Sequence, residues 1–326
     1  MILVVGATGQ LGTAIVRKLA DRGQPVRALA RRTSNYQALD RDGVELVFGD
    51  LLDEGSLVAA CTNVDTVIAT ANAAVPTQKR DSFKSVDGLG YVNLIRAAKG
   101  SGVRQIIYTS ALSQPGFDNL PIGRQKHDTE QKLRESGLIH TIFRADAFMD
   151  VYFAMMGSDL PVRGAESATV ERSFWFTSRF FNGVKDSMTK NGTVGIMGDG
   201  NTRHSFVCID DLAEFHVRAV RHPAAENKIY DIGGPEALTQ NEVLAVFEKI
   251  LGRSLKPKRT PAVIFKVGYN LLRFFSPAAA NIMGLNYYSA TNSSVVDMTS
   301  TADLFNVRLT SVEEFLREKA GIRTES

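Results

Sequence analysis

Directly after Met1 the chain reads Ile2-Leu3-Val4-Val5-Gly6-Ala7-Thr8-Gly9-Gln10-Leu11-Gly12, and this stretch indicates the class of fold. Its first four residues form an apolar, β-branched run of the kind found in buried strands. Three glycines with the spacing G-x-x-G-x-x-G follow, and apolar residues then recur three and four positions apart, which predicts a helix. A glycine-rich turn between a buried strand and a helix is typical of sites that bind phosphate.

Each glycine of this turn has a physical role in a dinucleotide-binding loop. Gly6 permits the tight turn, Gly9 lets the backbone approach a pyrophosphate, and Gly12 lets the helix pack closely on the strand. The free amides and the dipole at the start of the helix then attract the phosphates. The alternative, glycines that serve turns alone, is disfavoured by the strand before them and the helix after them. We therefore expect a pyrophosphate to be bound by the loop residues Gly6, Thr8, Gly9, Gln10, Leu11 and Gly12.

Strands and helices alternate through the first half of the chain. Further strands are predicted at 26–30, 44–48, 64–69, 105–109 and 139–144, and helices at 54–61, 81–101 and 123–136, with a weak helix at 36–41. This alternation implies right-handed βαβ units and therefore an α/β fold with a doubly wound parallel sheet, the Rossmann type. We expect residues 1–150 to form the Rossmann domain. Residues 151–326 are expected to form a smaller C-terminal substrate lobe, with segments at about 193–235 returning to the main sheet.

The end of the second predicted strand indicates which dinucleotide fits. A site for NAD usually carries Asp or Glu here, which accepts a hydrogen bond from the ribose 2′-hydroxyl. This chain has Arg31 and Arg32 instead, followed by Thr33 and Ser34. A guanidinium binds a 2′-phosphate through charge-assisted, often bidentate hydrogen bonds. The two arginines favour NADP(H), and the alternative is a solvated basic turn.

Composition limits the other classes of function. The net charge is +3 and no dense run of lysine and arginine occurs, so nucleic acid is not expected as a partner. Cys61 and Cys208 lie in apolar stretches and are expected to be buried free thiols rather than a disulfide or a metal site. The sequence contains no recognisable signal peptide and no run of ~18 uncharged apolar residues. We expect a soluble, cytoplasmic protein without a bound metal.

With these features together, the chain resembles the NmrA-like branch of the atypical short-chain dehydrogenases/reductases. The resemblance is carried by the glycine loop, by Gly49-Asp50-Leu51 after the third strand and by Tyr108-Thr109-Ser110-Ala111 after the fifth. Further matching segments are His127-Asp128-Thr129-Glu130, Ser136-Gly137-Leu138, Thr141-Ile142-Phe143-Arg144, Val207–Ala213 and Tyr230–Pro235. It implies an NADP-dependent oxidoreductase, and it weakens toward the C-terminal end of the chain.

The resemblance also implies which residues surround the cofactor. Asp50 and Leu51 are expected beside the adenine, and Thr70 and Ala71 along the ribose and pyrophosphate. Ser110, with Thr109 beside it, is expected near the nicotinamide, and Ala147 and Phe148 at the border of the nicotinamide pocket. The alternatives are local: Asp50 as the cap of the following turn, and Ser110 as the end of a strand.

One residue of the superfamily's active site is absent. Members with the full site use a Tyr-x-x-x-Lys pair in which the tyrosine transfers a proton. Here Lys126 has Ile122 four residues before it, and no tyrosine occurs between Tyr108 and Lys126. Lys126 is our candidate for polarising a carbonyl, with Ser110 as an orienting partner and His127 as an alternative donor. Lys126 as a cofactor-ribose ligand or a solvated side chain remains the alternative.

A second departure concerns Asp87 on the long helix predicted at 81–101. Relatives with the full site often have an asparagine there, which organises a water relay, and Val86-Asp87-Gly88 resembles the NmrA-like version. Both departures favour a quinone or enone reductase, or a non-catalytic sensor, over a general alcohol dehydrogenase.

The second half contains two apolar regions. Met149, Tyr152 and Phe153 follow the sixth strand and are expected to line a substrate pocket, with plain core as the alternative. Residues 261–288 are rich in large apolar side chains. They suit a lid over the pocket, a subunit or partner interface, or a helix resting on a membrane surface.

The sequence thus supports two functions of different classes. The first is NADPH-dependent reduction of a hydrophobic carbonyl, enone or quinone-like small molecule. The second is a non-catalytic NADP(H)-binding redox sensor or assembly scaffold. A sugar-nucleotide epimerase is disfavoured because that chemistry depends on the missing tyrosine.

Overall fold

A seven-stranded parallel sheet forms the centre of the protein. The computed structural model describes residues 1–326 except 75–77, 79, 163–181, 185–186 and 323–326. The strand order β3-β2-β1-β4-β5-β6-β9 confirms the predicted doubly wound α/β fold, since the chain runs outward from β1 in both directions. The strands are β1 (Ile2–Val5), β2 (Val26–Ala30), β3 (Val44–Phe48), β4 (Thr66–Ala69), β5 (Gln105–Ala111), β6 (Ile139–Ala145) and β9 (Lys228–Ile232).

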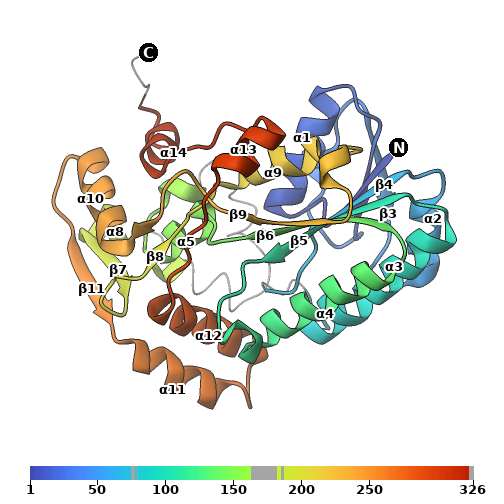
Figure 1. Ribbon diagram of the computed structural model, residues 1–326. Coiled ribbons are helices and arrows are strands. Elements are labelled where there is room, and N and C mark those ends of the chain that lie inside the picture. The colour runs from blue at the N-terminus through green and yellow to red at the C-terminus, as the bar shows by residue number, and fades with distance from the viewer. Residues whose placement is uncertain (75–77, 79, 163–181, 185–186, 323–326) are drawn as a thin grey trace.

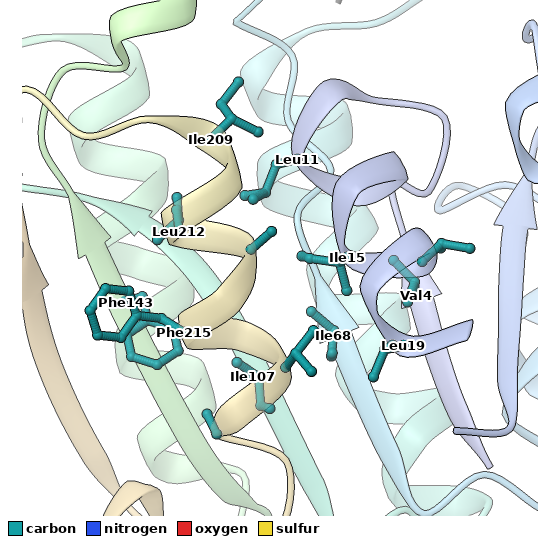
Figure 2. Close-up of a cluster of buried hydrophobic side chains, with 14 of the residues drawn as sticks. Val4, Leu11, Ile15, Leu19, Ile68, Ile107, Phe143, Ile209, Leu212 and Phe215 are labelled. Carbon is teal, nitrogen blue, oxygen red and sulfur yellow. The ribbon is translucent and has the colours of Figure 1, made fainter. Parts of the chain in front are cut away.

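Helices cover both faces of this sheet (Figure 1). On one face lie α1 (Gln10–Asp21) and α9 (Ile209–Arg218), and on the other lie α2 (Glu54–Cys61), α3 (Tyr91–Gly100) and α4 (Pro121–Glu135). Figure 2 shows α1 and α9 side by side, with their apolar side chains meeting over the strands. These side chains are Leu11, Ile15 and Leu19 from α1 and Ile209, Leu212 and Phe215 from α9.

The helix predicted at 81–101 has two parts. Its first half is a π-helical segment, η2 (Phe83–Gly90), which continues directly into α3. Ser82 caps η2, and its hydroxyl accepts a hydrogen bond from the Ser85 amide at 3.0 Å. A π-helical segment shifts the following side chains relative to a regular helix, and such segments are frequent at functional sites. Asp87 lies within it. The weak helix predicted at 36–41 is a single 3₁₀ turn, η1 (Gln37–Leu39).

The second half adds short sheets and helices beside the main sheet. β7 (Thr193–Met197) pairs with β11 (Lys256–Thr260), and β8 (Arg203–His204) pairs with β10 (Leu238–Thr239). Within 193–235, β9 joins the main sheet and α9 packs on α1, whereas β7 does not join it. The division into a Rossmann domain and a C-terminal substrate lobe near residue 150 stays a prediction. The other helices are α5 (Met149–Met155), α8 (Ser187–Asn191), α10 (Gln240–Leu251), α11 (Ala262–Leu272), α12 (Pro277–Thr291), α13 (Thr299–Phe305) and α14 (Val312–Lys319), with the 3₁₀ turns η3 (Phe117–Asn119), η4 (Leu160–Val162) and η6 (Pro223–Ala225).

The start of α9 differs from the sequence pattern, in which Asp210 or Asp211 would cap the helix. The helix begins at Ile209, and Cys208 is its N-cap, with Sγ accepting from the Asp211 amide at 3.4 Å. Asp211 is free of the capping role because its carboxylate accepts from the Thr310 amide at 2.7 Å. As predicted, Cys61 and Cys208 are buried free thiols.

A candidate dinucleotide site at the carboxyl ends of the strands

The glycine loop fits tightly between β1, β4 and α1. A Cβ atom on Gly6, whose φ is +87°, would lie 2.6 Å from the Ala71 nitrogen. A Cβ atom on Gly12 would lie 2.1 Å from the Gly6 carbonyl oxygen. Neither position has room for a side chain, so packing requires both glycines, and the positive φ of Gly6 requires a glycine there for backbone conformation as well.

The N-terminus of α1 is open for an anion. Its N-cap is Gly9, no side chain caps the helix, and its first turn contains no acidic residue. The loop is tied to the first turn of α1, because the Thr13 hydroxyl donates a hydrogen bond to the Ala7 carbonyl at 2.9 Å. Thr8 and Gln10 are partly exposed, whereas Leu11 is buried in the core. A rigid loop at the positive end of a helix dipole is suited to a pyrophosphate.

The end of β4 lies directly beside this loop. The Thr70 amide and hydroxyl both donate to the Val5 carbonyl, at 2.9 and 3.2 Å. Ala71 is partly exposed, and its carbonyl accepts from the Tyr91 hydroxyl at 2.7 Å. Thr70 and Ala71 therefore lie beside the glycine loop at the carboxyl end of β4.

The two arginines after β2 have different environments. Arg31 Nη1 contacts both carboxylate oxygens of Asp81, at 2.9 and 3.2 Å. The Arg32 guanidinium lies over the Phe48 ring, 4.6 Å from its centroid, and is exposed. The Asp81 side chain is almost completely buried, so a carboxylate of the protein itself neutralises Arg31 at the end of β2.

The turn after β3 contains the predicted Asp50 and Leu51. Asp50 Oδ1 accepts from the Leu52 amide at 2.9 Å, and its Oδ2 accepts from Arg80 at 2.6 Å. Leu51 is 8% exposed, and its carbonyl accepts from Asn93 at 3.0 Å. Asp50 therefore has the local turn-capping role, and it is also linked by Arg80 to the segment that carries Asp81.

Lys126 points into the protein and His127 points out. The two residues are consecutive on α4, yet Lys126 is 6% exposed and the His127 side chain is 55% exposed. His127 lies 3.9 Å from Asp118. The Lys126 ammonium donates to the Thr109 carbonyl at 2.9 Å and lies 4.8 Å from the centroid of the Tyr108 ring. Successive helical residues point about 100° apart, which explains the contrast.

The partner of Lys126 is Asp87, at 3.7 Å. Burial raises the pKa of Asp87 to about 6, and the Lys126 charge opposes this rise. Burial likewise lowers the pKa of Lys126, with Asp87 opposing that shift. One carboxylate oxygen of Asp87 accepts from the Ala73 amide at 2.8 Å, while the oxygen facing Lys126 has no hydrogen bond to a described residue. The pair is thus a buried, incompletely satisfied ion pair.

Ser110 and Thr109 project from opposite sides of β5. The Ser110 hydroxyl donates to Glu130 at 2.5 Å, and Glu130 also forms a bidentate pair with Arg144, which lies beside Ser110 on β6. The Thr109 hydroxyl contacts His216 Nε2 at 2.8 Å. Because His216 Nδ1 donates to the Leu212 carbonyl at 2.8 Å and burial lowers the pKa of His216 to about 4, this histidine is neutral and Nε2 accepts from Thr109.

The residues after β6 pack against the second half of the chain. Phe148 forms a bridge with Val207 and is partly exposed, as is Ala147. The predicted pocket residues Met149, Tyr152 and Phe153 are 0–4% exposed and belong to a core cluster that includes Phe206, Phe247 and Phe315. Their contact with a substrate stays a prediction. The buried Tyr152 hydroxyl has no hydrogen-bond partner among the described residues.

Three charged residues at this edge were given no role at the site by the sequence analysis: Asp81, Glu130 and Arg144. Glu130 follows Lys126 by four residues and therefore shares its buried helix face, and a charge at such a position is a usable signal. Arg144 is the one charged residue at the end of a predicted buried strand, which is a second signal. Asp81 gives no such signal in the sequence, because its role depends on a contact with Arg31 that is fifty residues away along the chain.

The residues present fit a dinucleotide with a 2′-phosphate. The donor set is an uncapped helix N-terminus, a glycine turn without room for side chains, and two guanidinium groups at the end of β2. No cluster of side chains suited to holding a metal ion occurs among the described residues. No described helix is both long and apolar enough to cross a bilayer.

A parallel sheet of this order with a glycine loop after β1 defines a Rossmann-type fold of the dinucleotide-binding class. The chain belongs to the NmrA-like family, whose model matches residues 1–316.

Relatives with different names are similar to this chain. Photosystem II assembly factor Ycf39 of Trieres chinensis is 24% identical and aligns with 97% of this chain and 92% of its own length. The (4-alkanoyl-5-oxo-2,5-dihydrofuran-3-yl)methyl phosphate reductase of Streptomyces griseus is 31% identical, over 78% of this chain and 76% of its own. Among solved structures, the NADPH-dependent quinone oxidoreductase QOR2 of Escherichia coli complexed with NADPH has the same fold, with a TM-score of 0.73 and 22% identity over 98% of this chain and 99% of its own.

Proposed function

We propose that this protein binds NADP(H) and reduces a hydrophobic carbonyl, enone or quinone-like small molecule. The observation that carries the proposal is the placement of one buried lysine, Lys126, against Asp87 and the end of β5, on the sheet edge that also holds the glycine loop. Open α/β sheets bind ligands at this edge. A related reductase at 31% identity and a solved NADPH complex of the same fold support it.

The chain's own residues divide the work of binding. The loop Gly6–Gly12 and the amides of α1 are proposed to hold the pyrophosphate, with Thr70 and Ala71 beside it. Arg31 and Arg32 are proposed to bind the 2′-phosphate, and Asp50 and Leu51 to border the adenine. Bound NADPH would supply the hydride, whereas the protein orients the substrate and stabilises charge.

Lys126 is proposed to stabilise negative charge on the substrate oxygen. Its ammonium is held at the end of β5 by the Thr109 carbonyl, and the Asp87 carboxylate opposes the lowering of its pKa by burial. A cation in a low-dielectric site stabilises a developing oxyanion more strongly than a solvated one does. Ser110 is assigned a positioning role, because its hydroxyl is directed at Glu130. His127 is exposed beside Asp118 and points away from the buried face of α4.

The first experiment measures binding and turnover separately. Purified protein is titrated with NADPH and NADH by nicotinamide fluorescence, and a panel of quinones and enones is then tested for NADPH oxidation. Lys126→Met should leave NADPH affinity within about threefold and lower turnover at least about a hundredfold, as expected for a lost electrostatic contact at the reacting oxygen. His127→Ala is the matched control on the same helix and should match wild type. Turnover that survives Lys126→Met would remove the lysine from the mechanism.

A second candidate is a cofactor-binding assembly scaffold without turnover. It is favoured by the relative named as a photosystem II assembly factor, whose similarity extends over 97% of the chain against 78% for the reductase. The missing tyrosine and the enclosed position of Lys126 point in the same direction. Tight NADPH binding with no oxidation by any panel member would favour the scaffold, and binding of neither dinucleotide would contradict both functions. A cytoplasmic location also stays a prediction.

A further inference from the structure

Six large apolar side chains along and just after α11 are exposed to solvent. Their exposures range from 51% for Val267 to 84% for Phe275. The full set is Val263, Ile264, Val267, Leu271, Phe274 and Phe275, which we call the α11 stripe. Single exposed apolar residues are ordinary, but a contiguous group of this kind marks a surface that binds something.

The stripe occupies one face of a helix. At 100° per residue, Val263, Ile264, Val267 and Leu271 fall within an arc of about 100°, and Phe274 and Phe275 extend it past the helix end. The opposite face packs on the protein, since Phe265 is 8% exposed and a Cβ on Gly268 would touch Met283 of α12 at 3.2 Å. Figure 1 shows α11 at the outer edge of the molecule, beyond α12. The stripe therefore faces away from the sheet and from the candidate site, and is not a lid.

The charge around the stripe has one sign. Residues 249–296 contain seven lysines and arginines and no aspartate or glutamate. This segment's charge of +7 exceeds the whole chain's +3, so the rest of the chain is net acidic. Lys249 is paired with Glu313 at 2.7 Å, and the other six cations have no carboxylate partner among the described residues. A surface that combines apolar side chains with net positive charge is complementary to a layer with an apolar interior and anionic headgroups.

The basic side chains are placed beside the stripe. Lys266 and Arg273 lie on one flank of α11, about 60–80° beyond Val263 around the helix axis. Lys258 is exposed on β11, directly before α11. None of the three has a carboxylate partner among the described residues, and Lys266 and Arg273 lie against the rings of Tyr287 and Phe274. Flexible cations at the edge of an apolar face are the arrangement of helices that lie in a membrane interface.

We propose that α11 docks this protein on an anionic lipid surface, with the α11 stripe inserted at the headgroup level. The helix has 11 residues, about half of what a span requires, so it lies in the plane of the surface. A symmetric contact between two copies would bring two segments of +7 together, which disfavours self-association through this face. The inference is independent of whether the protein catalyses a reaction.

The test is flotation with vesicles of defined composition. Full-length protein is mixed with vesicles of phosphatidylcholine alone or with 30 mol% phosphatidylglycerol, at low and high salt. Wild type should float with the anionic vesicles and much less with the neutral ones, and high salt should reduce the bound fraction. Phe274→Ser/Phe275→Ser should lower partitioning about tenfold or more, because apolar insertion is lost. Lys258→Glu/Lys266→Glu should lower it and weaken the salt dependence.

Matched controls separate docking from folding. Val58→Ser and Leu304→Ser remove exposed apolar side chains at 46% and 42% exposure elsewhere, and should float like wild type. All variants should keep the wild-type melting temperature. Absence of flotation on anionic vesicles overturns the proposal. So does wild-type partitioning by the Phe274/Phe275 variant, or a dimer in sedimentation that the same variant dissociates, which would make the stripe a contact between copies.

Discussion

The ammonium nitrogen of Lys126 lies 3.7 Å from a carboxylate oxygen of Asp87 that accepts no hydrogen bond from a described residue. Both side chains are enclosed, at 6% and 0% exposure. Each charge is costly to bury, and each is tolerated because the other is present. Such a pair keeps a cation at a dry position, which suits a site that must stabilise charge on a substrate.

Asp87 should make folding pH-dependent. Its pKa is raised to about 6 in the folded protein, so folding favours the protonated carboxyl and ionisation opposes it. Its contribution is therefore neutral below the unfolded pKa of about 4, and it lowers the free energy of unfolding as the pH rises through 6. The loss amounts to roughly 3 kcal/mol for a shift of about two units. Asp87→Asn cannot ionise at this position and should therefore lack this pH-dependent loss of stability.

The measurement is urea unfolding of wild type and Asp87→Asn at pH 4, 5, 6 and 7. The difference between the two proteins should change in favour of the variant as the pH rises, since groups that do not contact Asp87 titrate equally in both. A difference independent of pH would show that Asp87 does not titrate in this range.

Asp81 should compete with the 2′-phosphate for Arg31. The pairing at 2.9 and 3.2 Å has to be replaced when a phosphate binds the same guanidinium. Asp81→Asn should therefore tighten NADPH binding several-fold and leave NADH binding unchanged, whereas Arg31→Ala should weaken NADPH about tenfold, or ~1.4 kcal/mol. Equal effects of either substitution on both dinucleotides would place the 2′-phosphate elsewhere. The ratio of the two dissociation constants is the quantity to report.

Gly12 should be intolerant of even a methyl group. A Cβ there would lie 2.1 Å from the Gly6 carbonyl oxygen, which belongs to backbone and cannot turn aside. Gly12→Ala should abolish dinucleotide binding. It should also lower the free energy of unfolding by about 1–3 kcal/mol or more, which is the usual cost of overpacking a core. Gly100→Ala, with nothing within 4 Å of the added atom, is the matched control and should be neutral. Thermal unfolding and NADPH titration of both variants check this.

The sheet was predictable because most of its strands are largely apolar and most crossovers have the period of a helix. The exception is β9, in which Lys228 and Asp231 hide the strand pattern. Thr239 and Glu242 form a capping box at the start of α10, and such a cap depends only on the spacing of four adjacent residues. Local patterns could not give the π-helical segment that contains Asp87, because a single short π segment is too brief to alter the apolar period of the helix as a whole. They also could not give the cap at Cys208, because the competing partner of Asp211 is Thr310, far along the chain.

The residues of the candidate site also divide into those that local motifs locate and those that depend on contacts between elements. The glycine loop and the arginines after β2 are contiguous in sequence, and motif spacing locates them. The pairing of Arg31 with Asp81 and of Ser110 with Glu130 depends on contacts between elements. Which of Met149, Tyr152 and Phe153 would meet a substrate also depends on packing, because apolar pocket and apolar core have the same composition.

Substitution of Ser110 tests whether the end of β5 contacts the reacting groups or only stabilises the fold. Its hydroxyl donates at 2.5 Å to Glu130, which Arg144 already neutralises. A hydrogen bond to a charged group contributes about 1.5–3 kcal/mol, so Ser110→Ala should lower the free energy of unfolding by that amount. Turnover of NADPH with a quinone should change less than about threefold, because the hydroxyl is engaged inside the protein.

Glu130→Gln is the companion variant, since it keeps the shape and removes the charge that Arg144 and Ser110 share. It should cost more stability than Ser110→Ala, because it leaves a guanidinium that is 30% exposed without its carboxylate. The two losses should also be non-additive in the double variant, as expected for one shared network. If Ser110→Ala instead lowers turnover strongly while stability is unchanged, the hydroxyl contacts the reacting groups, and Ser110 belongs with Lys126 in the catalytic machinery.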